Sequence, residues 1–184
     1  MQACAFVVGS DDGQGAALRL LARQVGFEAV FPYRDIADAE RQSASTPLIY
    51  FLFSAVDRLG KLTRVGEAVR RSQSRRVRFA PMIYFAETPP LDTIRACINV
   101  GFDDIITLPV TQSRVEERLE RQLYRAVTYY ETATYFGPDR RNRLGHESHG
   151  HSGRGTGGQH RLLEIVRNPG AGIEILRDDT QVMV

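Results

Sequence analysis

The chain has 184 residues, enough for one domain of ordinary size and an extension. Apolar residues make up 42% of the chain, which excludes a wholly disordered protein, and the formal net charge is only +2. The sequence has neither an apolar stretch of about 18 residues nor the start of a secretion signal. We therefore expect a cytoplasmic protein without a membrane span.

Taken in chain order, short apolar runs alternate with segments of helical periodicity. The apolar runs predict strands at residues 3–8, 27–33, 47–54, 80–85 and 105–108. The periodic segments predict helices at residues 14–25, 35–43, 59–72 and 90–100, and a long last helix from Thr111 or Ser113 to about Tyr135. Five alternations of this kind predict a doubly wound α/β domain with a five-stranded parallel sheet in the order 2-1-3-4-5.

The run TPLIYFLFSA, residues 46–55, predicts the strand around which this sheet is built. It is a continuous apolar run, entered through a proline and left through small residues, as expected for a strand that is covered on both faces. It contains no carboxylate. The run therefore offers no carboxylate that could accept a transferred group.

The chain beyond the last helix predicts three further parts. Residues 128–143 extend the helix and end in an arginine motif, residues 144–160 form a Gly/His/Ser linker, and residues 161–184 form a β-hairpin around Asn168–Gly172. An isolated hairpin is marginally stable in water. It must therefore dock on the domain's own sheet edge, on the aromatic end of the last helix, or on a second copy.

The segment from Arg78 to Leu123 resembles the second half of response-regulator receiver domains, which are CheY-like. The resemblance is carried by APMIYFAE, IRACINVGFDD and IITLPV, and in layout it extends over residues 3–127. It implies a phosphorylation pocket with an acidic pair, an acceptor aspartate, a hydroxyl and a lysine. In this chain those positions fall on Gly9, Ser10, Phe53, Ala86 and Leu108.

These replacements favour a pseudo-receiver, a domain that keeps the scaffold but cannot be phosphorylated. Phosphoryl transfer to a protein side chain needs a carboxylate, and the transferred group needs nearby cations. We therefore expect no catalytic residue, no enzyme activity, no cofactor and no bound metal. Asp11 and Asp12 lie just beyond the acidic pair, either as a solvated turn or as a cation site.

Binding surfaces are expected outside this pocket. Candidate ligand or partner residues are Arg75, Arg76 and Arg78, and, in the tail, Tyr135, Phe136, Asp139, Arg140, Arg141 and Arg143. Arginine favours bidentate contacts to phosphate or carboxylate, although a solvated helix face explains the first cluster equally well. Leu123, Val127 and Tyr130 predict either a dimer interface on the last helix or a contact to the chain's own C-terminus.

The sequence thus favours a signalling or adaptor protein in two-component signal transduction, one that acts by protein–protein docking and is a homodimer. The first alternative is an effector that binds cyclic di-GMP through arginine side chains, as some receiver-like proteins do. The second is nucleic-acid binding through the basic third helix, which ranks last because no helix-turn-helix pattern occurs.

Overall fold

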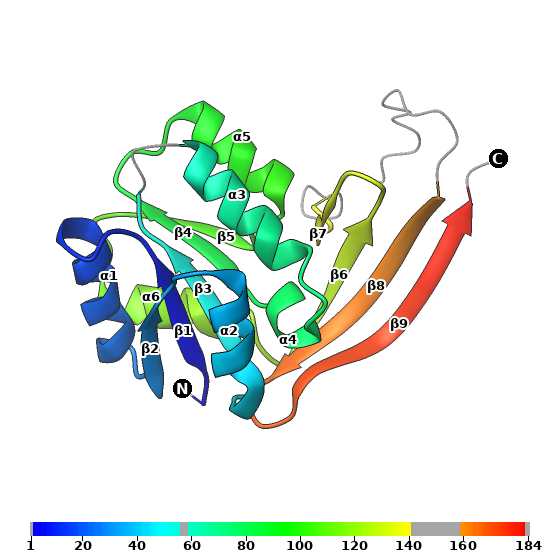
Figure 1. The fold of residues 1–184 in the computed structure, drawn as a ribbon, viewed down its shortest axis with the longest axis horizontal. Helices are drawn as coiled ribbons and strands as arrows, with labels where there is room; N and C mark the ends of the chain where they lie inside the picture. Colours follow the sequence, from blue (N-terminus) through cyan, green and yellow to red (C-terminus); the bar gives the residue numbers. More distant parts are fainter. Residues whose placement is uncertain (1, 56–58, 141–158, 183–184) are drawn as a thin grey trace.

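The computed structural model describes residues 2–55, 59–140 and 159–182. A five-stranded parallel sheet, with the strand order β2-β1-β3-β4-β5, lies at the centre of its N-terminal part (Figure 1). The strands are β1 (Cys4–Val8), β2 (Ala29–Pro32), β3 (Ile49–Phe53), β4 (Met82–Ala86) and β5 (Asp104–Thr107). The order confirms the predicted doubly wound fold. We call this part, from β1 to the last helix, the α/β domain.

Helices cover both faces of the central sheet (Figure 1). One face is packed by α1 (Gly13–Gln24) and α6 (Gln112–Glu120), which bury Leu18 and Leu119 there. The other face is covered by α2 (Ile36–Gln42), α3 (Leu59–Arg70), α4 (Arg75–Arg78) and α5 (Leu91–Val100), and a 3-10 turn at Ser43–Ser45 follows α2. Both faces of the sheet are therefore dry, as the apolar strands require.

The central strand β3 is fully buried, as its sequence predicts. Its side chains alternate, so that Tyr50 and Leu52 face α1 and α6, whereas Phe51 and Phe53 face α3 and α5. The Tyr50 hydroxyl donates a hydrogen bond to the Leu119 carbonyl at 3.1 Å, which satisfies the only polar atom of that ring.

The prediction of a long last helix is wrong. Helix α6 ends at Glu120, and Ala126–Glu131 form strand β6. The residues of β6 are mostly β-branched or aromatic, types that favour strands. Their burial also alternates, since Tyr129 is buried and Thr128 is exposed. The predicted helix extension at residues 128–143 is therefore a strand, a turn and a second short strand over its described part.

The predicted C-terminal hairpin is confirmed, and it completes a second, antiparallel sheet. This C-terminal sheet has the order β7-β6-β8-β9 and contains, besides β6, the strands β7 (Phe136–Pro138), β8 (Gln159–Asn168) and β9 (Gly172–Val182). The Asn168 side chain accepts a hydrogen bond from the Gly170 N–H at 2.9 Å in the turn. Of the expected docking partners, β8 pairs with β6, the segment predicted as the aromatic end of the helix.

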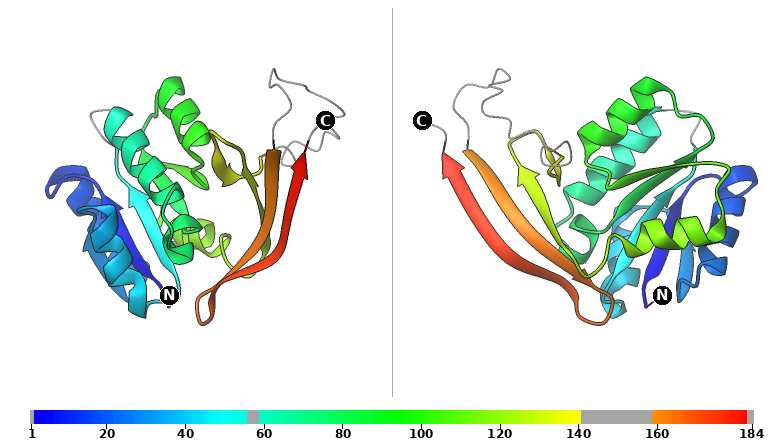
Figure 2. Two further views of the ribbon diagram at one scale, coloured as in Figure 1. Left: turned by 45° about the vertical axis from the view of Figure 1, so that its right-hand side comes forward. Right: turned by 180° about the vertical axis from the view of Figure 1, so that it is seen from behind.

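The C-terminal sheet packs at the amino edge of the central sheet, where the parallel strands begin (Figure 2). Its hairpin turn touches the segment before β3, because a Cβ on Gly172 would lie 2.9 Å from the Pro47 carbonyl oxygen. Gly172 also has a φ of +88°, so only glycine fits there without strain. The opposite, carboxyl edge of the central sheet is left uncovered by this second sheet (Figure 2).

No helix among the described residues is long and apolar enough to cross a membrane.

Candidate functional site

The first candidate site is the carboxyl edge, where β1, β3, β4 and β5 end. Gly9 and Ser10 follow β1 there, Ala86 ends β4, and the Leu108 N–H donates to the Ala86 carbonyl at 3.0 Å. Gly9 approaches the end of β3 so closely that a Cβ would lie 2.3 Å from the Ser54 hydroxyl oxygen. The structure therefore brings four of the five predicted pocket residues to one edge.

Phe53 ends β3 at the same level, but its ring packs inside the domain. It is fully buried and meets the Phe102 ring edge-on at a centroid distance of 4.6 Å. The side chain that follows it, Ser54, is the one that lies at the carboxyl edge, with its hydroxyl 3.4 Å from the Val8 carbonyl oxygen. Neither residue has a carboxylate.

Two cavities open at this edge. The smaller, of about 240 Å³, is mostly apolar; we call it the edge pocket, and it is lined by Gln14, Ala17, Leu18, Leu21, Ser54, Ala55, Phe85, Glu87 and Leu108. The larger, of about 500 Å³, is the edge groove, lined by Gln14, Ala55, Leu59, Tyr84, Ala86, Glu87, Thr88, Pro89, Pro90 and Thr93. Because Gln14, Ala55 and Glu87 line both, the two cavities adjoin.

The acidic pair of the sequence, Asp11 and Asp12, comes soon after β1. Asp11 and Asp12 are exposed at the start of α1, and an Asp11 carboxylate oxygen lies 3.6 Å from the Arg19 guanidinium. Within the described ranges, no three His, Cys, Asp or Glu side chains come together to hold a cation.

The predicted arginine cluster is largely used within the fold. Arg75 is exposed on α4, whereas Arg76 donates to the Ser43 carbonyl at 3.0 Å and to the Ala44 carbonyl. Arg78 forms an ion pair with Glu131 of β6, and its guanidinium lies over the Phe136 ring at 3.9 Å. Two of the three arginines therefore tie α4 to its neighbours.

The tail motif is also structural where it is described. Phe136 is buried between Phe79 and Tyr129, and the Tyr135 hydroxyl donates to the Pro138 carbonyl at 3.2 Å. The Asp139 N–H donates to the Thr128 carbonyl at 2.7 Å, and Arg140 donates to the Phe102 carbonyl. Arg141 and Arg143 lie outside the described residues.

The predicted interface residues divide between the core and the surface. Leu123 is buried, and Val127 packs against the core that includes Tyr129. Tyr130 is half-buried, and its ring lies 5.2 Å from that of His160. Val127 therefore makes the contact to the chain's own C-terminal part that the sequence offered as the alternative to a dimer interface, since it lies opposite Ile165 of β8.

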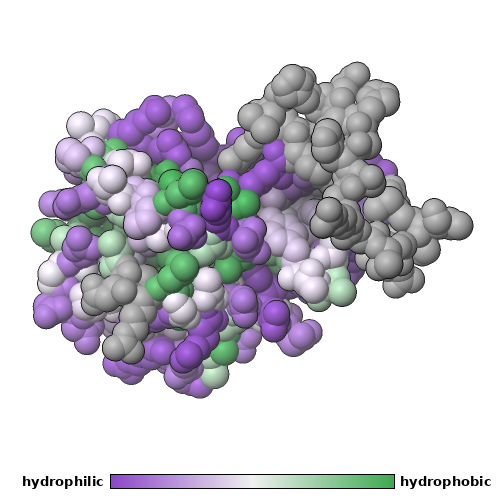
Figure 3. All heavy atoms as spheres, turned by 90° about the horizontal axis from the view of Figure 1, so that it is seen from above, coloured by the Kyte–Doolittle hydropathy of each residue, from purple (hydrophilic) through white to green (hydrophobic). Residues whose placement is uncertain are grey.

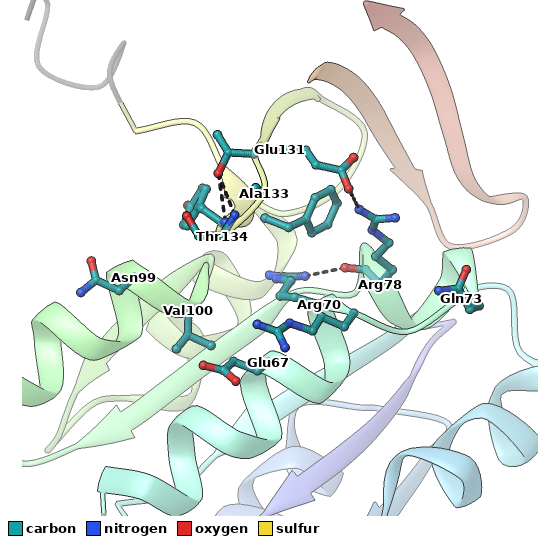
Figure 4. Close-up of a pocket in the computed structure, with 13 residues that line it drawn as sticks. Glu67, Arg70, Gln73, Arg78, Asn99, Val100, Glu131, Ala133 and Thr134 are labelled. Carbon is teal, nitrogen blue, oxygen red and sulfur yellow. Dashed lines mark hydrogen bonds and ion pairs between the residues drawn. The ribbon is translucent and has the colours of Figure 1, made fainter. Parts of the chain in front are cut away.

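A third cavity, of about 370 Å³, lies between the end of α3, the end of α5 and the β6–β7 turn (Figure 4). It is lined by Glu67, Arg70, Arg71, Gln73, Arg78, Asn99, Val100, Glu131, Thr132, Ala133, Thr134, Tyr135 and Phe136. Figure 4 shows that Arg70 and Arg78 enter it already bonded, Arg70 to the Arg78 carbonyl and Arg78 to Glu131. Arg71 is the exposed arginine on its rim.

Beneath this cavity lies a buried ionic network that sequence reasoning missed. Asp103, 2% exposed, accepts hydrogen bonds at 2.7 Å from Arg70 of α3 and from Arg167 of β8. It also accepts from the Tyr129 hydroxyl at 3.0 Å and the Met82 N–H at 2.9 Å. Burial by itself raises the pKa of Asp103, but the charges of Arg167 and Arg70 outweigh it and hold the pKa below its usual value.

Arg167 is the deepest member of this network, with no exposed surface. Its guanidinium also donates to the Phe79 carbonyl at 2.9 Å and to Gln122 at 3.3 Å. The sequence signal for it was a single arginine inside the apolar run LLEIVR just before a turn. The network fastens the C-terminal sheet to the α/β domain at the amino edge, away from the edge cavities.

Comparisons with known proteins concern the α/β domain. No family model and no curated protein matches the sequence. Among solved structures, a two-component response regulator from Clostridium difficile is 16% identical over 65% of this chain and 93% of its own, with a TM-score of 0.48. The receiver domain of a sensor histidine kinase from Pseudomonas aeruginosa is 16% identical over 64% and 94%, with a TM-score of 0.49. A chemotaxis protein from Vibrio cholerae is 16% identical over 65% of this chain and 97% of its own, with a TM-score of 0.49.

Proposed function

We propose that this chain is a receiver-like signalling module that takes no phosphoryl group and acts by docking to a partner protein. One observation carries the proposal: β3 ends at Phe53 and is followed by Ser54 and Ala55, so no carboxylate stands at the end of the central strand or in the two residues after it. Transfer to an aspartate needs that nucleophile and cations around the phosphoryl group. Among the described residues that line the edge cavities, Glu87 is the only charged one.

Incubation of the full chain with acetyl phosphate and Mg²⁺ is expected to leave its intact mass unchanged. An active receiver domain treated in parallel serves as the positive control. A stoichiometric, hydroxylamine-sensitive adduct would contradict the proposal. Asp11→Asn and Asp12→Asn variants would then show whether either exposed aspartate carries the group.

We also propose a homodimer. Because the predicted long last helix does not form, the interface is the outer face of the C-terminal sheet. Tyr130, Leu162 and Val166 are half-buried and lie on the face opposite the core residues Tyr129 and Leu163. Strand β9 is an edge strand of 11 residues. Edge strands of this length offer unpaired backbone groups to a second copy.

Light scattering of the full chain is expected to give twice its mass of 20.6 kDa. Leu162→Glu should give the monomer, because it places a charge in the centre of the interface. Leu20→Glu is the matched control, since Leu20 is 56% exposed on α1, far along the chain from this sheet. A monomeric wild-type chain would refute the dimer without affecting the docking proposal.

The two alternative functions have less support. Cyclic di-GMP would need free guanidinium groups, but Arg76, Arg78 and Arg140 are bonded within the chain. Nucleic-acid binding through α3 would use its exposed Lys61 and Arg64, whereas Arg70 of the same helix is buried.

A further inference from the structure

The edge pocket has the size and lining of a site for a single apolar side chain. At about 240 Å³ it is smaller than cavities that enclose a whole small-molecule ligand, which usually hold about 300–1,000 Å³. Leu18, Leu21, Phe85 and Leu108 supply most of its apolar lining. A leucine, methionine or phenylalanine side chain would be removed from water there, which favours binding.

The position of the pocket in the sheet also favours binding. Gln14 comes from the helix after β1, and Ser54 and Ala55 follow β3, so the pocket lies where the strand order changes direction between β1 and β3. In open α/β sheets, ligands bind at the carboxyl ends of the strands at such a point.

The surroundings of the pocket are apolar as well. Leu59 lines the adjoining groove and is 40% exposed, and Leu91, next to the lining residue Pro90, is 60% exposed. In the view from above, hydrophobic side chains lie open on the α/β part of the surface (Figure 3). Exposed apolar surface beside a cavity is typical of interaction sites.

The one charged side chain among the described residues that line the two cavities is negative. Glu87 lines both cavities, and Asp11 and Asp12 lie exposed after β1 at the same edge. No lysine or arginine is among the described residues that line the two cavities. A segment that inserts an apolar side chain here would therefore gain from a neighbouring Lys or Arg.

We infer that the carboxyl edge is the docking site for a protein segment with one large apolar side chain flanked by basic residues. The apolar side chain fills the edge pocket, and a flanking cation lies in the edge groove beside Glu87. This inference rests on the proposed docking function and adds its location and the chemistry of the partner.

The test uses the full-length, ¹⁵N-labelled chain and three capped peptides. The first is Gly-Ser-Lys-Leu-Phe-Lys-Ser-Gly, the second has Glu in place of both Lys, and the third has Ala in place of Leu and Phe. The first peptide is expected to shift the amide signals of α1 and of residues 54–55 and 86–88, and to bind at least about tenfold more tightly than the other two.

Four variants locate the contact. Ala17→Phe adds a ring to an exposed position of α1 that lines the pocket, and should weaken binding about tenfold because the ring occupies the site. Leu20→Phe places the same ring on the same helix outside both cavities, and should leave binding unchanged. Glu87→Arg should reverse the preference from the basic to the acidic peptide, whereas Glu28→Arg, at an exposed position before β2, should not.

Each outcome decides the inference. Peptide binding that is equal for the leucine and alanine peptides, or shifts confined to the cavity beside Arg71, overturns it. No leucine-dependent shift at millimolar peptide also overturns it. In both cases the proposed docking function still stands, provided that the acetyl phosphate experiment yields no adduct, whereas an aspartyl adduct would remove both.

Discussion

Replacing Asp103 by asparagine is expected to lower the free energy of unfolding by about 3–5 kcal/mol. The substitution keeps the shape of the side chain but leaves Arg70 and Arg167 buried without an anion, and both are at most 2% exposed. Removing one member of a buried ionic group costs far more than the group contributes as a whole, because the remaining charges stay desolvated. Urea denaturation at pH 7 measures the difference.

The neighbouring residue provides the matched control. Asp104 forms an ion pair with Arg118, but the two side chains are 15% and 28% exposed. Asp104→Asn should therefore cost no more than about 1 kcal/mol. Equal losses in the two variants would show that the Asp103 network contributes no more than a surface pair.

The same network predicts a pH dependence. The pKa of Asp103 is lower in the folded chain than in the unfolded chain, where it is about 3.9. Its contribution to stability is therefore complete above that value and is lost as the pH falls towards the folded pKa. The stability gap between the wild type and Asp103→Asn should be constant from pH 7 to about pH 5 and shrink below about pH 4. A gap that widens in acid would contradict the assignment.

Replacing Arg167 by methionine is the second large change, with an expected loss of about 3 kcal/mol. Methionine fills much of the space, but the Phe79 carbonyl and the Tyr129 hydroxyl lose a buried donor. The loss should be smaller than for Asp103→Asn, because Asp103 keeps its ion pair with Arg70. Hydrogen exchange should show that the amides of Leu163 and Ile165 in β8 lose protection before those of β3, since Arg167 attaches β8 to the α/β domain.

Arg161→Met tests whether any arginine of β8 has this effect. Arg161 lies on the same strand and the same face, but its side chain is 41% exposed and pairs with Asp178 at the surface. We expect a change of at most about 1 kcal/mol and unaltered exchange in β8. If Arg161→Met loosened β8 as much as Arg167→Met, the attachment would not depend on the buried site.

The sequence was most informative where burial of apolar side chains alone determines the local structure. The five central strands are apolar runs bounded by turn residues, and burial alone specifies them. Residues 126–131 combine two signals, because Val127 and Tyr130 fit a helical stripe while Val127 and Tyr129 fit a strand. Pairing with β8, whose partner residues lie thirty to forty positions further along the chain, decides between them. Local periodicity contains no information about that partner.

The sequence predicts which residues lie at the carboxyl edge of the sheet, but it does not predict the direction in which their side chains point. Strand ends meet at one edge in any parallel sheet, and Gly9, Ala86 and Leu108 all lie at that edge. The direction of the Phe53 ring depends on which of two faces each residue of β3 occupies, and an all-apolar strand does not reveal this. Arg70 and Arg167 were missed because arginine is almost never fully buried unless it is paired. Their partner, Asp103, is far away in the sequence.

The attachment of β8 to the start of β5 has a consequence for how the protein is made. A ribosome synthesises the α/β domain first, so Arg70 and Asp103 meet while residue 167 is still untranslated. Until then the amino edge of the nascent domain lacks its cover, and Phe79 and the Asp103 carboxylate remain open to water or to chaperones. The C-terminal sheet can therefore close over this edge only after β8 has left the ribosome.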